Sequence, residues 1–199
     1  MRWGMVIDLR KCIGCGACAL VCGQVNKMPT NLWRRVFDCG ISEAPERKRT
    51  CLPMSCMHCS KAPCLEVCPT AATFRRHDGI IDIKYKLCIG CGYCMVACPY
   101  MARSIVFQNE YDPEPDRIGV CSKCNFCLPR IDSGLVKGLK PGQDSEASPM
   151  CVVSCAADAL CFGNLDDPDS TVAQLIRENK AVSLQEELGT DPAVYYLVD

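Results

Sequence analysis

This sequence has little net charge, few aromatic side chains and no long apolar run. Its 22 lysines and arginines nearly balance its 23 aspartates and glutamates, which leaves a formal net charge of −1. Nucleic-acid-binding domains usually concentrate positive charge, so we expect no nucleic-acid partner. No apolar run approaches the roughly 20 residues of a membrane-spanning helix, and we therefore expect no span in this chain.

Aromatic residues make up only 7 % of the chain, so they contribute little to a hydrophobic core. Metal clusters are then expected to replace part of that core, as disulfides and structural metals do in small domains. The first ten residues lead directly into a cysteine motif, without the apolar segment of a secretory signal peptide. The internal pairs Arg34-Arg35 and Arg75-Arg76 are not twin-arginine export signals.

Cysteine, in contrast, is abundant, with 20 residues in a chain of 199. Such a content indicates disulfides, zinc sites or iron–sulfur clusters. Disulfides are typical of secreted proteins, and structural zinc usually takes two C-x2-C pairs separated by a spacer. The spacings described next fit iron–sulfur clusters better than either.

The stretch from 88 to 99 has the spacing C-x2-C-x2-C-x3-C-P, which is the bacterial ferredoxin signature for a [4Fe–4S] cluster. Its residues are Cys88, Cys91, Cys94, Cys98 and Pro99. We expect the first three cysteines to surround one cubane. We expect the fourth to begin a short helix and to bind a neighbouring cluster, as in two-cluster ferredoxins. Gly90 and Gly92 would let the backbone approach the inorganic core.

The same spacing occurs near the start of the chain, with Gly23 in place of the final proline. Its cysteines are Cys12, Cys15, Cys18 and Cys22. Each copy follows a short apolar stretch, at 6–9 and at 80–83, that predicts a β-strand. The chain therefore contains an internal repeat of a ferredoxin-like unit.

Two further groups of cysteines have related spacings. One has the spacing C-x2-C-x4-C-x3-C-P and consists of Cys56, Cys59, Cys64, Cys68 and Pro69. The other is less regular and consists of Cys121, Cys124, Cys127, Cys151 and Cys155. It needs one pair at x2 spacing, and Cys121 with Cys124 satisfies this as well as Cys124 with Cys127. Spacing alone leaves that choice open.

Outside the motifs, the sequence predicts a few ordinary elements. Residues 73–76 and 80–83 flank a His-Asp-Gly turn and predict a β-hairpin. The polar stretch 26–50 predicts a surface loop or insertion, in which Cys39 is expected to be a buried small apolar residue. Residues 109–117 are acidic and rich in proline, as in a connector.

The C-terminal part carries no catalytic signal. Asp169 or Ser170 can cap a helix over 172–177, and residues 193–198 are apolar enough for a final strand.

Four cysteine motifs in this order resemble the four-cluster, ferredoxin-like electron-transfer subunits of the dimethyl sulfoxide reductase type of molybdenum oxidoreductases. Polysulfide, tetrathionate and arsenate reductases have relatives of this kind. The resemblance covers nearly the whole chain, including 4–8, 163–168 and 188–192. Family members carry Lys-Cys-x2-Cys with an arginine soon after, which matches 123–127 and Arg130. The resemblance thus implies Cys124 and Cys127 as ligands, with Cys121 left over.

The family also implies how the cysteines share four [4Fe–4S] clusters. The first set is Cys12, Cys15, Cys18 and Cys155; the second is Cys22, Cys124, Cys127 and Cys151; the third is Cys56, Cys59, Cys64 and Cys98; the fourth is Cys68, Cys88, Cys91 and Cys94. Cys51 and Cys161 are left over, like Cys121.

The implied fold is α+β, with two nested two-cluster units built from short strands, short helices and long loops. The outer unit comprises 1–50 and 117–165, the inner unit 51–116, and a helix-and-strand extension 166–199.

Four residues beside the ligands are candidates for tuning the clusters. Lys11, Lys86 and Lys123 each precede the first cysteine of a motif, where a positive charge raises a cluster's potential. The alternative for each is an ordinary surface lysine. His58 lies between two ligands and could donate to a cluster sulfur, although a histidine packed beside the loop is the commoner case.

These features predict an electron conduit rather than an enzyme, because fully ligated cubanes leave no iron open to substrate. The resemblance implies a large molybdenum- or tungsten-bis-pterin catalytic partner and a membrane quinone-linked subunit or soluble carrier at the other end. Alternatives are a free-standing polyferredoxin, the iron–sulfur subunit of a formate dehydrogenase or hydrogenase, and a zinc-binding interaction module. The expected location is the cytoplasm or the cytoplasmic face of the inner membrane, or the periplasm after co-export with a twin-arginine partner.

Overall fold

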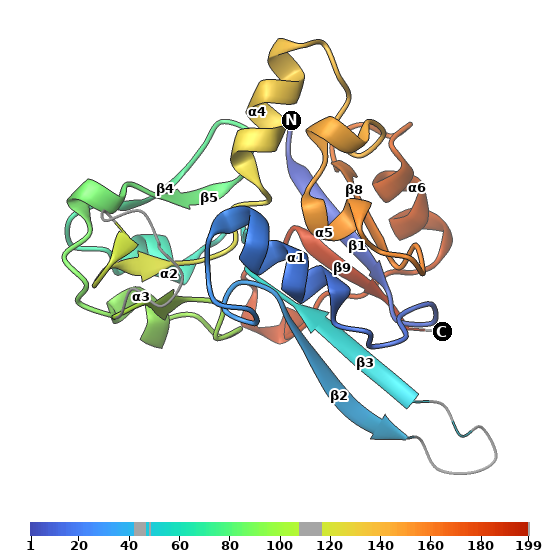
Figure 1. Ribbon diagram of the computed structural model, residues 1–199, viewed down its shortest axis with the longest axis horizontal. Coiled ribbons are helices and arrows are strands. Elements are labelled where there is room, and N and C mark those ends of the chain that lie inside the picture. The colour runs from blue at the N-terminus through green and yellow to red at the C-terminus, as the bar shows by residue number, and fades with distance from the viewer. Residues whose placement is uncertain (42–46, 48, 108–116, 199) are drawn as a thin grey trace.

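The computed structural model describes residues 1–41, 47, 49–107 and 117–198, and Figure 1 shows their arrangement. The elements are short, and both helices and strands contribute, so the fold is mixed α+β. The acidic connector predicted at 109–117 lies outside the described residues except for Arg117. No helix in the described part of the chain has the length and apolar character needed to cross a membrane.

A three-stranded sheet joins the two ends of the chain. Strand β1 (Trp3–Asp8) lies in the middle, antiparallel to β8 (Leu160–Asn164) and parallel to β9 (Val194–Leu197). All six residues of β1 are buried, as expected for a central strand covered on both faces. The strands predicted at the start and end of the chain are confirmed.

The middle of the chain forms a second group of elements, on the left in Figure 1, while β1, β8 and β9 lie on the right. It contains the hairpin of β4 (Thr73–Arg75) and β5 (Ile81–Ile83), which confirms the hairpin predicted from the His-Asp-Gly turn. Two single-turn helices accompany it, α2 (Pro63–Glu66) and α3 (Tyr93–Val96), with a 3₁₀ turn at Tyr85–Leu87.

The remaining elements connect the cysteine motifs. Helix α1 (Ala17–Asn26) packs against α5 (Met150–Val153), and α4 (Leu128–Val136) packs against the 3₁₀ turn Ser145–Ala147. Strand β6 (Ser104–Ile105) pairs with β7 (Cys121–Ser122). A further 3₁₀ turn covers Glu186–Leu188.

The prediction of a surface loop over 26–50 is wrong for the part that forms strands. Strands β2 (Arg35–Ile41) and β3 (Arg49–Met54) form an antiparallel hairpin that extends away from the rest of the chain in Figure 1. Polar residues alternate poorly there because most of β2 is solvent-exposed on both faces, so the pattern gave no strand signal. Cys39 lies in β2 and is exposed, which corrects the buried position predicted for it.

The apolar core continues from the sheet into the cysteine loops. Trp3 stacks on Phe162 at a ring-centroid distance of 5.5 Å, and Phe162 meets the edge of Phe126 at 5.2 Å. Phe126 in turn stacks on His58 at 3.8 Å. This row of rings leads from β1 and β8 to the loop between two predicted ligands. A small number of aromatic residues therefore connects the sheet with the cysteine loops.

The opposite face of the sheet is covered by α6 (Thr171–Glu178). Val6 and Leu197 pack there against Val172. The Ser170 hydroxyl accepts a hydrogen bond from the backbone N–H of Ala173 at 3.2 Å, which confirms the predicted capped helix and selects Ser170 over Asp169 as its cap.

We expect Ser170→Ala to destabilise the protein by about 1 kcal/mol, because it leaves a backbone N–H of the first helical turn without its acceptor. For a protein of this size that lowers the midpoint of thermal unfolding by about 2–4 °C. Asp169→Ala is the control and should leave the midpoint almost unchanged. Equal losses in both variants, measured anaerobically on the loaded protein, would contradict the assignment of the cap.

Candidate metal centres

The two copies of the C-x2-C-x2-C motif form the same loop. Gly14 and Gly90 both have φ of 69°, and Gly16 and Gly92, which precede α1 and α3, have φ of 74° and 77°. These left-handed conformations favour glycine. Space is limited as well, because a Cβ added to Gly90 would lie 2.2 Å from the carbonyl oxygen of Gly119. The sequence repeat is therefore a repeat of backbone geometry.

The position of the helices differs from the prediction. Each helix starts just before the third cysteine of the motif, so Cys18 lies in α1 and Cys94 in α3. The fourth cysteine does not begin a helix: Cys22 lies within α1, and Cys98 follows the end of α3. One helical turn separates the third cysteine from the fourth, and this turn carries the fourth away from the loop.

The first set of cysteines surrounds one cavity. A small cavity of about 20 Å³ lies inside the first loop, and its lining includes Cys12, Cys15, Cys18 and Cys155. The other lining residues are small or apolar, such as Val36, Pro53 and Leu160. A thiol from the end of the fourth motif thus faces the loop of the first.

The second set is the most deeply buried. Cys22, Cys124, Cys127 and Cys151 are all buried. Burial raises the pKa of Cys22, and the nearby thiols of Cys124, Cys151 and Cys127 raise it further. The amide of Asn26 lies between the first and fourth motifs, with its nitrogen 3.7 Å from the sulfur of Cys22 and 3.9 Å from that of Cys127.

The third set combines the second and third motifs. Burial raises the pKa of Cys59 to about 12, with further contributions from the thiols of Cys56, Cys64 and Cys98. Cys98 therefore lies beside the second motif, although it belongs to the third. Metal binding requires the thiolate form, so loading such buried thiols releases protons.

In the fourth set, Cys88 and Cys94 lie close to Cys121. The Cys94 thiol donates to the sulfur of Cys121 at 3.4 Å, and the backbone N–H of Cys121 donates to the sulfur of Cys88 at 3.4 Å. The hydrogen-bonded contact with Cys121 lowers the pKa of Cys94. Cys91 is exposed, and the sulfur of Cys68 accepts from the backbone N–H of Thr73 at 3.4 Å.

These contacts bear on the choice that spacing left open. Cys121 lies in β7, beside thiols of the third motif, whereas Cys127 lies beside Cys22 and Cys124. The geometry thus favours Cys127 over Cys121 as the partner of Cys124. Pairing of β7 with β6 holds Cys121 in place, and no spacing rule could have located that pair of two-residue strands.

The four predicted tuning residues occupy different environments. Lys11 and Lys86 are exposed, whereas Lys123 and His58 are buried. The Lys123 ammonium donates to the carbonyl oxygens of Ile81 and Cys124, so Lys123 is not a surface lysine. Burial keeps the pKa of His58 well below its ordinary value, and the neighbouring charge of Lys123 lowers it further. The His58 ring is therefore neutral.

Unsatisfied buried donors test whether the residues fit an iron–sulfur cluster. Nδ1 of His58 accepts from the backbone N–H of Ile81 at 3.1 Å, so the proton of the neutral ring is on Nε2. Nε2 is buried and has no hydrogen-bond partner among the described residues, and the same holds for Nε and one terminal nitrogen of Arg34. Buried donors beside thiols need acceptors, and the sulfides of a cluster are such acceptors. The residues fit the cofactor.

Sequence reasoning missed two buried arginines, Arg34 and Arg103, whose side chains lie among the predicted ligands. Arg34 is part of the stretch interpreted as a surface loop, and Arg103 lies beyond the end of the third motif. The only available signal was the position of Arg103 close after Cys98 and Pro99.

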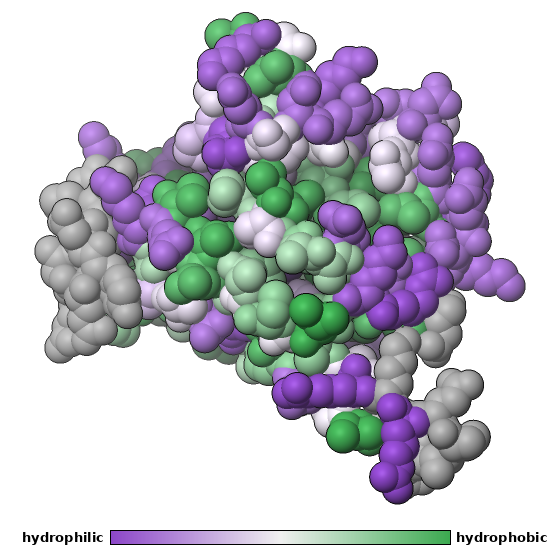
Figure 2. All heavy atoms as spheres, turned by 45° about the vertical axis from the view of Figure 1, so that its right-hand side comes forward, coloured by the Kyte–Doolittle hydropathy of each residue, from purple (hydrophilic) through white to green (hydrophobic). Residues whose placement is uncertain are grey.

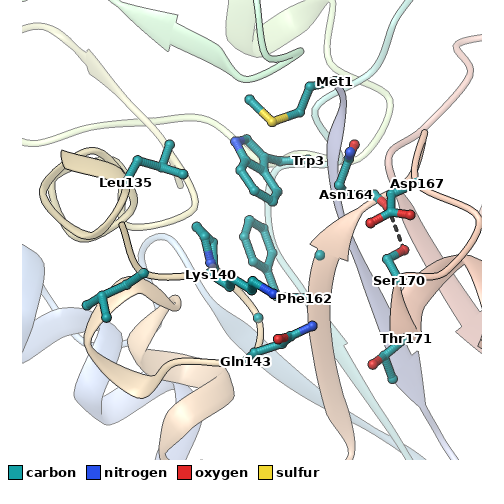
Figure 3. Close-up of a pocket in the computed structure, with 14 residues that line it drawn as sticks. Met1, Trp3, Leu135, Lys140, Gln143, Phe162, Asn164, Asp167, Ser170 and Thr171 are labelled. Carbon is teal, nitrogen blue, oxygen red and sulfur yellow. Dashed lines mark hydrogen bonds between the residues drawn. The ribbon is translucent and has the colours of Figure 1, made fainter. Parts of the chain in front are cut away.

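Another cavity, of about 230 Å³, lies away from the cysteines (Figure 3). Trp3 and Phe162 form its inner wall, with Leu135 and Lys140 on one side and Asp167 on the other. None of its lining residues is a cysteine.

Comparison with known families assigns the class of protein. The model of the 4Fe–4S dicluster domain family matches residues 48–165, and that of a 4Fe–4S binding domain matches residues 3–22. The chain belongs to this family of iron–sulfur proteins.

Curated relatives narrow the class. The chain is 42 % identical, over 98 % of its length and 79 % of the relative, to a protein of Halobacterium salinarum provisionally named as an iron-sulfur subunit of dimethyl sulfoxide reductase. It is 36 % identical to a subunit of selenate reductase from Mesobacillus selenatarsenatis, over 99 % of the chain and 72 % of the relative. Identity is also 36 % to a subunit of tetrathionate reductase from Salmonella typhimurium, over 98 % and 72 %. The chain therefore belongs to this family of iron–sulfur subunits of reductases, as the resemblance implied.

We expect Cys98→Ser to perturb the cluster of the second motif, because the Cys98 thiol lies beside Cys56 and Cys64. Electron paramagnetic resonance (EPR) of the reduced protein should show the signal that changes in Cys59→Ser, and not the one that changes in Cys91→Ser. Cys39→Ser, an exposed cysteine outside the motifs, is the control and should change neither signal. A Cys98→Ser spectrum matching that of Cys91→Ser would contradict this arrangement.

Proposed function

We propose that this chain holds four [4Fe–4S] clusters and conducts electrons between a molybdenum- or tungsten-bis-pterin catalytic subunit and a second redox partner. The second partner is a membrane quinone-linked subunit or a soluble carrier. The observation that carries the proposal is the grouping of thiols. The contacts of the first, second and third sets each bring together cysteines from two different motifs, as cross-ligated clusters require.

The burial of the sets supports a conduit with two ends. In the first and fourth sets the middle cysteine of the loop, Cys15 or Cys91, is exposed. The isoleucine before it is exposed too, to 67 % for Ile13 and 68 % for Ile89. The second set, in contrast, is fully buried. Two accessible end sites and a buried interior suit a chain that receives electrons at one end and delivers them at the other.

The residues of the chain hold each site and shape its electrostatics. When bound, a [4Fe–4S] cluster takes up and releases one electron at a time. Backbone N–H groups donate to the ligand sulfurs, for example Ala159 to Cys155 at 3.3 Å and Phe126 to Cys124 at 3.5 Å. Such hydrogen bonds stabilise negative charge on sulfur and are among the features that set cluster potentials. Burial of the second set excludes water from the interior.

Surface character supports a partner. Figure 2 shows hydrophobic residues gathered over the middle of one face, with hydrophilic residues along its upper and right-hand margins. Leu20 and Val25 of α1 are among the exposed large apolar residues. Exposed apolar patches of this kind are typical of interaction surfaces. The names of the relatives describe subunits of reductases, which supports a catalytic partner for this chain as well.

We also propose the nested arrangement of two units, with 1–50 and 117–165 forming the outer unit, 51–116 the inner unit and 166–199 the extension. Pairing of β1 with β8 supports the outer unit, since it joins the first and last cysteine motifs. The location follows the partner: the cytoplasm or the cytoplasmic face of the inner membrane, or the periplasm after co-export.

We expect sixteen irons and sixteen acid-labile sulfides per chain after anaerobic purification, four of each for every cluster. The protein should be brown, and zinc should be absent from the metal analysis. Half the iron would contradict the four-cluster proposal, and a colourless protein with zinc would replace it with a zinc-binding interaction module.

Gentle anaerobic purification through a tag on this chain should also recover a large subunit that contains molybdenum or tungsten and pterin. A stable, fully loaded monomer without that subunit would contradict the proposed partner and favour a free polyferredoxin. Recovery with a hydrogenase or formate dehydrogenase catalytic subunit would assign the chain to that complex.

A further inference from the structure

Two arginines lie in the interior among the predicted ligands. Arg34 is 1 % exposed, and one of its terminal nitrogens lies 3.5 Å from the sulfur of Cys151 and 3.0 Å from that of Met5. Arg103 is 4 % exposed, and it donates to the sulfur of Cys64 at 3.0 Å. Its other terminal nitrogen donates to Thr73 Oγ1 at 3.1 Å and lies 3.7 Å from the sulfur of Cys121.

Buried guanidinium groups need negative partners, since removing a charge from water costs several kcal/mol unless it is paired. In the described part of the chain, no carboxylate forms an ion pair with either arginine. Burial by itself would lower the pKa of Arg34, but nearby thiolates, that of Cys151 first, raise it above its ordinary value. The same balance raises the pKa of Arg103, with the Cys64 thiolate first.

The two arginines occupy equivalent places in the internal repeat. Each lies within electrostatic range of the third cysteine of a C-x2-C-x2-C motif, Cys18 for Arg34 and Cys94 for Arg103. Each also lies near the first and third cysteines of a second motif, which is the fourth motif for Arg34 and the second motif for Arg103. Those are Cys124 and Cys151 for Arg34, and Cys56 and Cys64 for Arg103. Each arginine thus contributes its charge to both sets of one unit.

The repeat itself does not explain this equivalence. Arg103 follows the last cysteine of its motif closely and leads into β6, whereas Arg34 comes after α1 and leads into β2. The two side chains reach the same place from different sequence positions and different elements. The match therefore lies in the position of the charge and not in the sequence position of the residue.

We propose that Arg34 and Arg103 set the reduction potentials of the clusters in pairs. The charge of Arg34 acts on the clusters of the first and second sets, and that of Arg103 on those of the third and fourth. The inference rests on the proposed function, since it requires that the four sets hold clusters. A fixed positive charge in a low-dielectric interior stabilises the reduced cluster, which carries one more negative charge, and so raises its potential.

Arginine suits this role better than lysine. Its guanidinium stays charged under all physiological conditions, and its several N–H groups can donate in different directions. Arg34 and Arg103 should therefore keep the potentials independent of proton uptake by these groups. Lys123, in contrast, is occupied by two backbone carbonyls.

The test is an EPR-monitored redox titration of the complex purified through this chain, with Arg34→Gln and Arg103→Gln. We expect each variant to make reduction of two of the four clusters at least tenfold less favourable, which corresponds to 59 mV for one electron. The two variants should affect different pairs. Arg34→Lys and Arg103→Lys keep the charge and should restore most of each shift.

Arg35→Gln is the matched control. Arg35 is the next residue in the chain, but it donates to the backbone carbonyl of Met101 and lies over the ring of Phe37. Its removal takes away the same charge without changing a contact to sulfur. The equilibrium constant for reduction of each of the four clusters should therefore change less than threefold. If Arg35→Gln had an equal effect, the shifts would come from the net charge of the protein and not from the position of Arg34 and Arg103. That result would overturn the inference.

The outcomes separate this inference from the proposed function. Wild-type protein without iron would overturn the proposed function itself. Wild-type protein with full iron, together with unchanged potentials in both glutamine variants, would overturn only the role of the arginines. If Arg34→Gln lost the clusters of the outer unit, full iron in Arg34→Lys would support the need for charge. Equal loss in the lysine variant would overturn it.

Discussion

Sulfur in the interior is the constraint on which this structure depends. The main core cluster contains six predicted ligands beside its aromatic and aliphatic residues: Cys18, Cys22, Cys56, Cys59, Cys124 and Cys151. Helices α2, α3 and α5 have four residues each, too few to be stable in isolation. Thiols so close together, many with raised pKa values, gain little from one another without metal. The proposed clusters would supply the attraction that the apolar core lacks.

The internal repeat explains why distant segments meet. In the proposed arrangement, a fourth cysteine that leaves its own loop binds at the loop of another motif, so each motif needs a partner. The first motif has its partner at the far end of the chain, and the pairing of β1 with β8 brings Cys12 and Cys155 to one cavity. Contacts between His58, Phe126, Lys123 and Ile81 then join the second motif, the fourth motif and strand β5. Two of the residues predicted to tune clusters therefore also connect the two regions.

Local signals made part of this fold predictable. Spacing identified the loops, the His-Asp-Gly turn identified the hairpin of β4 and β5, and a capping residue, Asp169 or Ser170, ahead of 172–177 identified α6. The β2–β3 hairpin could not be predicted in this way, because β2 is largely exposed and lacks an alternating pattern. The place of Cys121 depends on the pairing of β7 with β6, and that of Arg34 on its contacts with Met5 and Cys151. Both are long-range arrangements that no short motif encodes.

The buried arginines also bear on how a chain of closely spaced anionic centres can persist. Every thiolate and every added electron increases the negative charge of an interior that already excludes water around the second set. The exposed loops of Cys15 and Cys91 can rely on solvent to screen that charge, but the interior sites cannot. One cation in each unit, placed beside Cys151 or Cys64, opposes the charge where screening is weakest. In the proposed function, the accessible ends would exchange electrons with partners, and the chain's own arginines would oppose the negative charge of the interior.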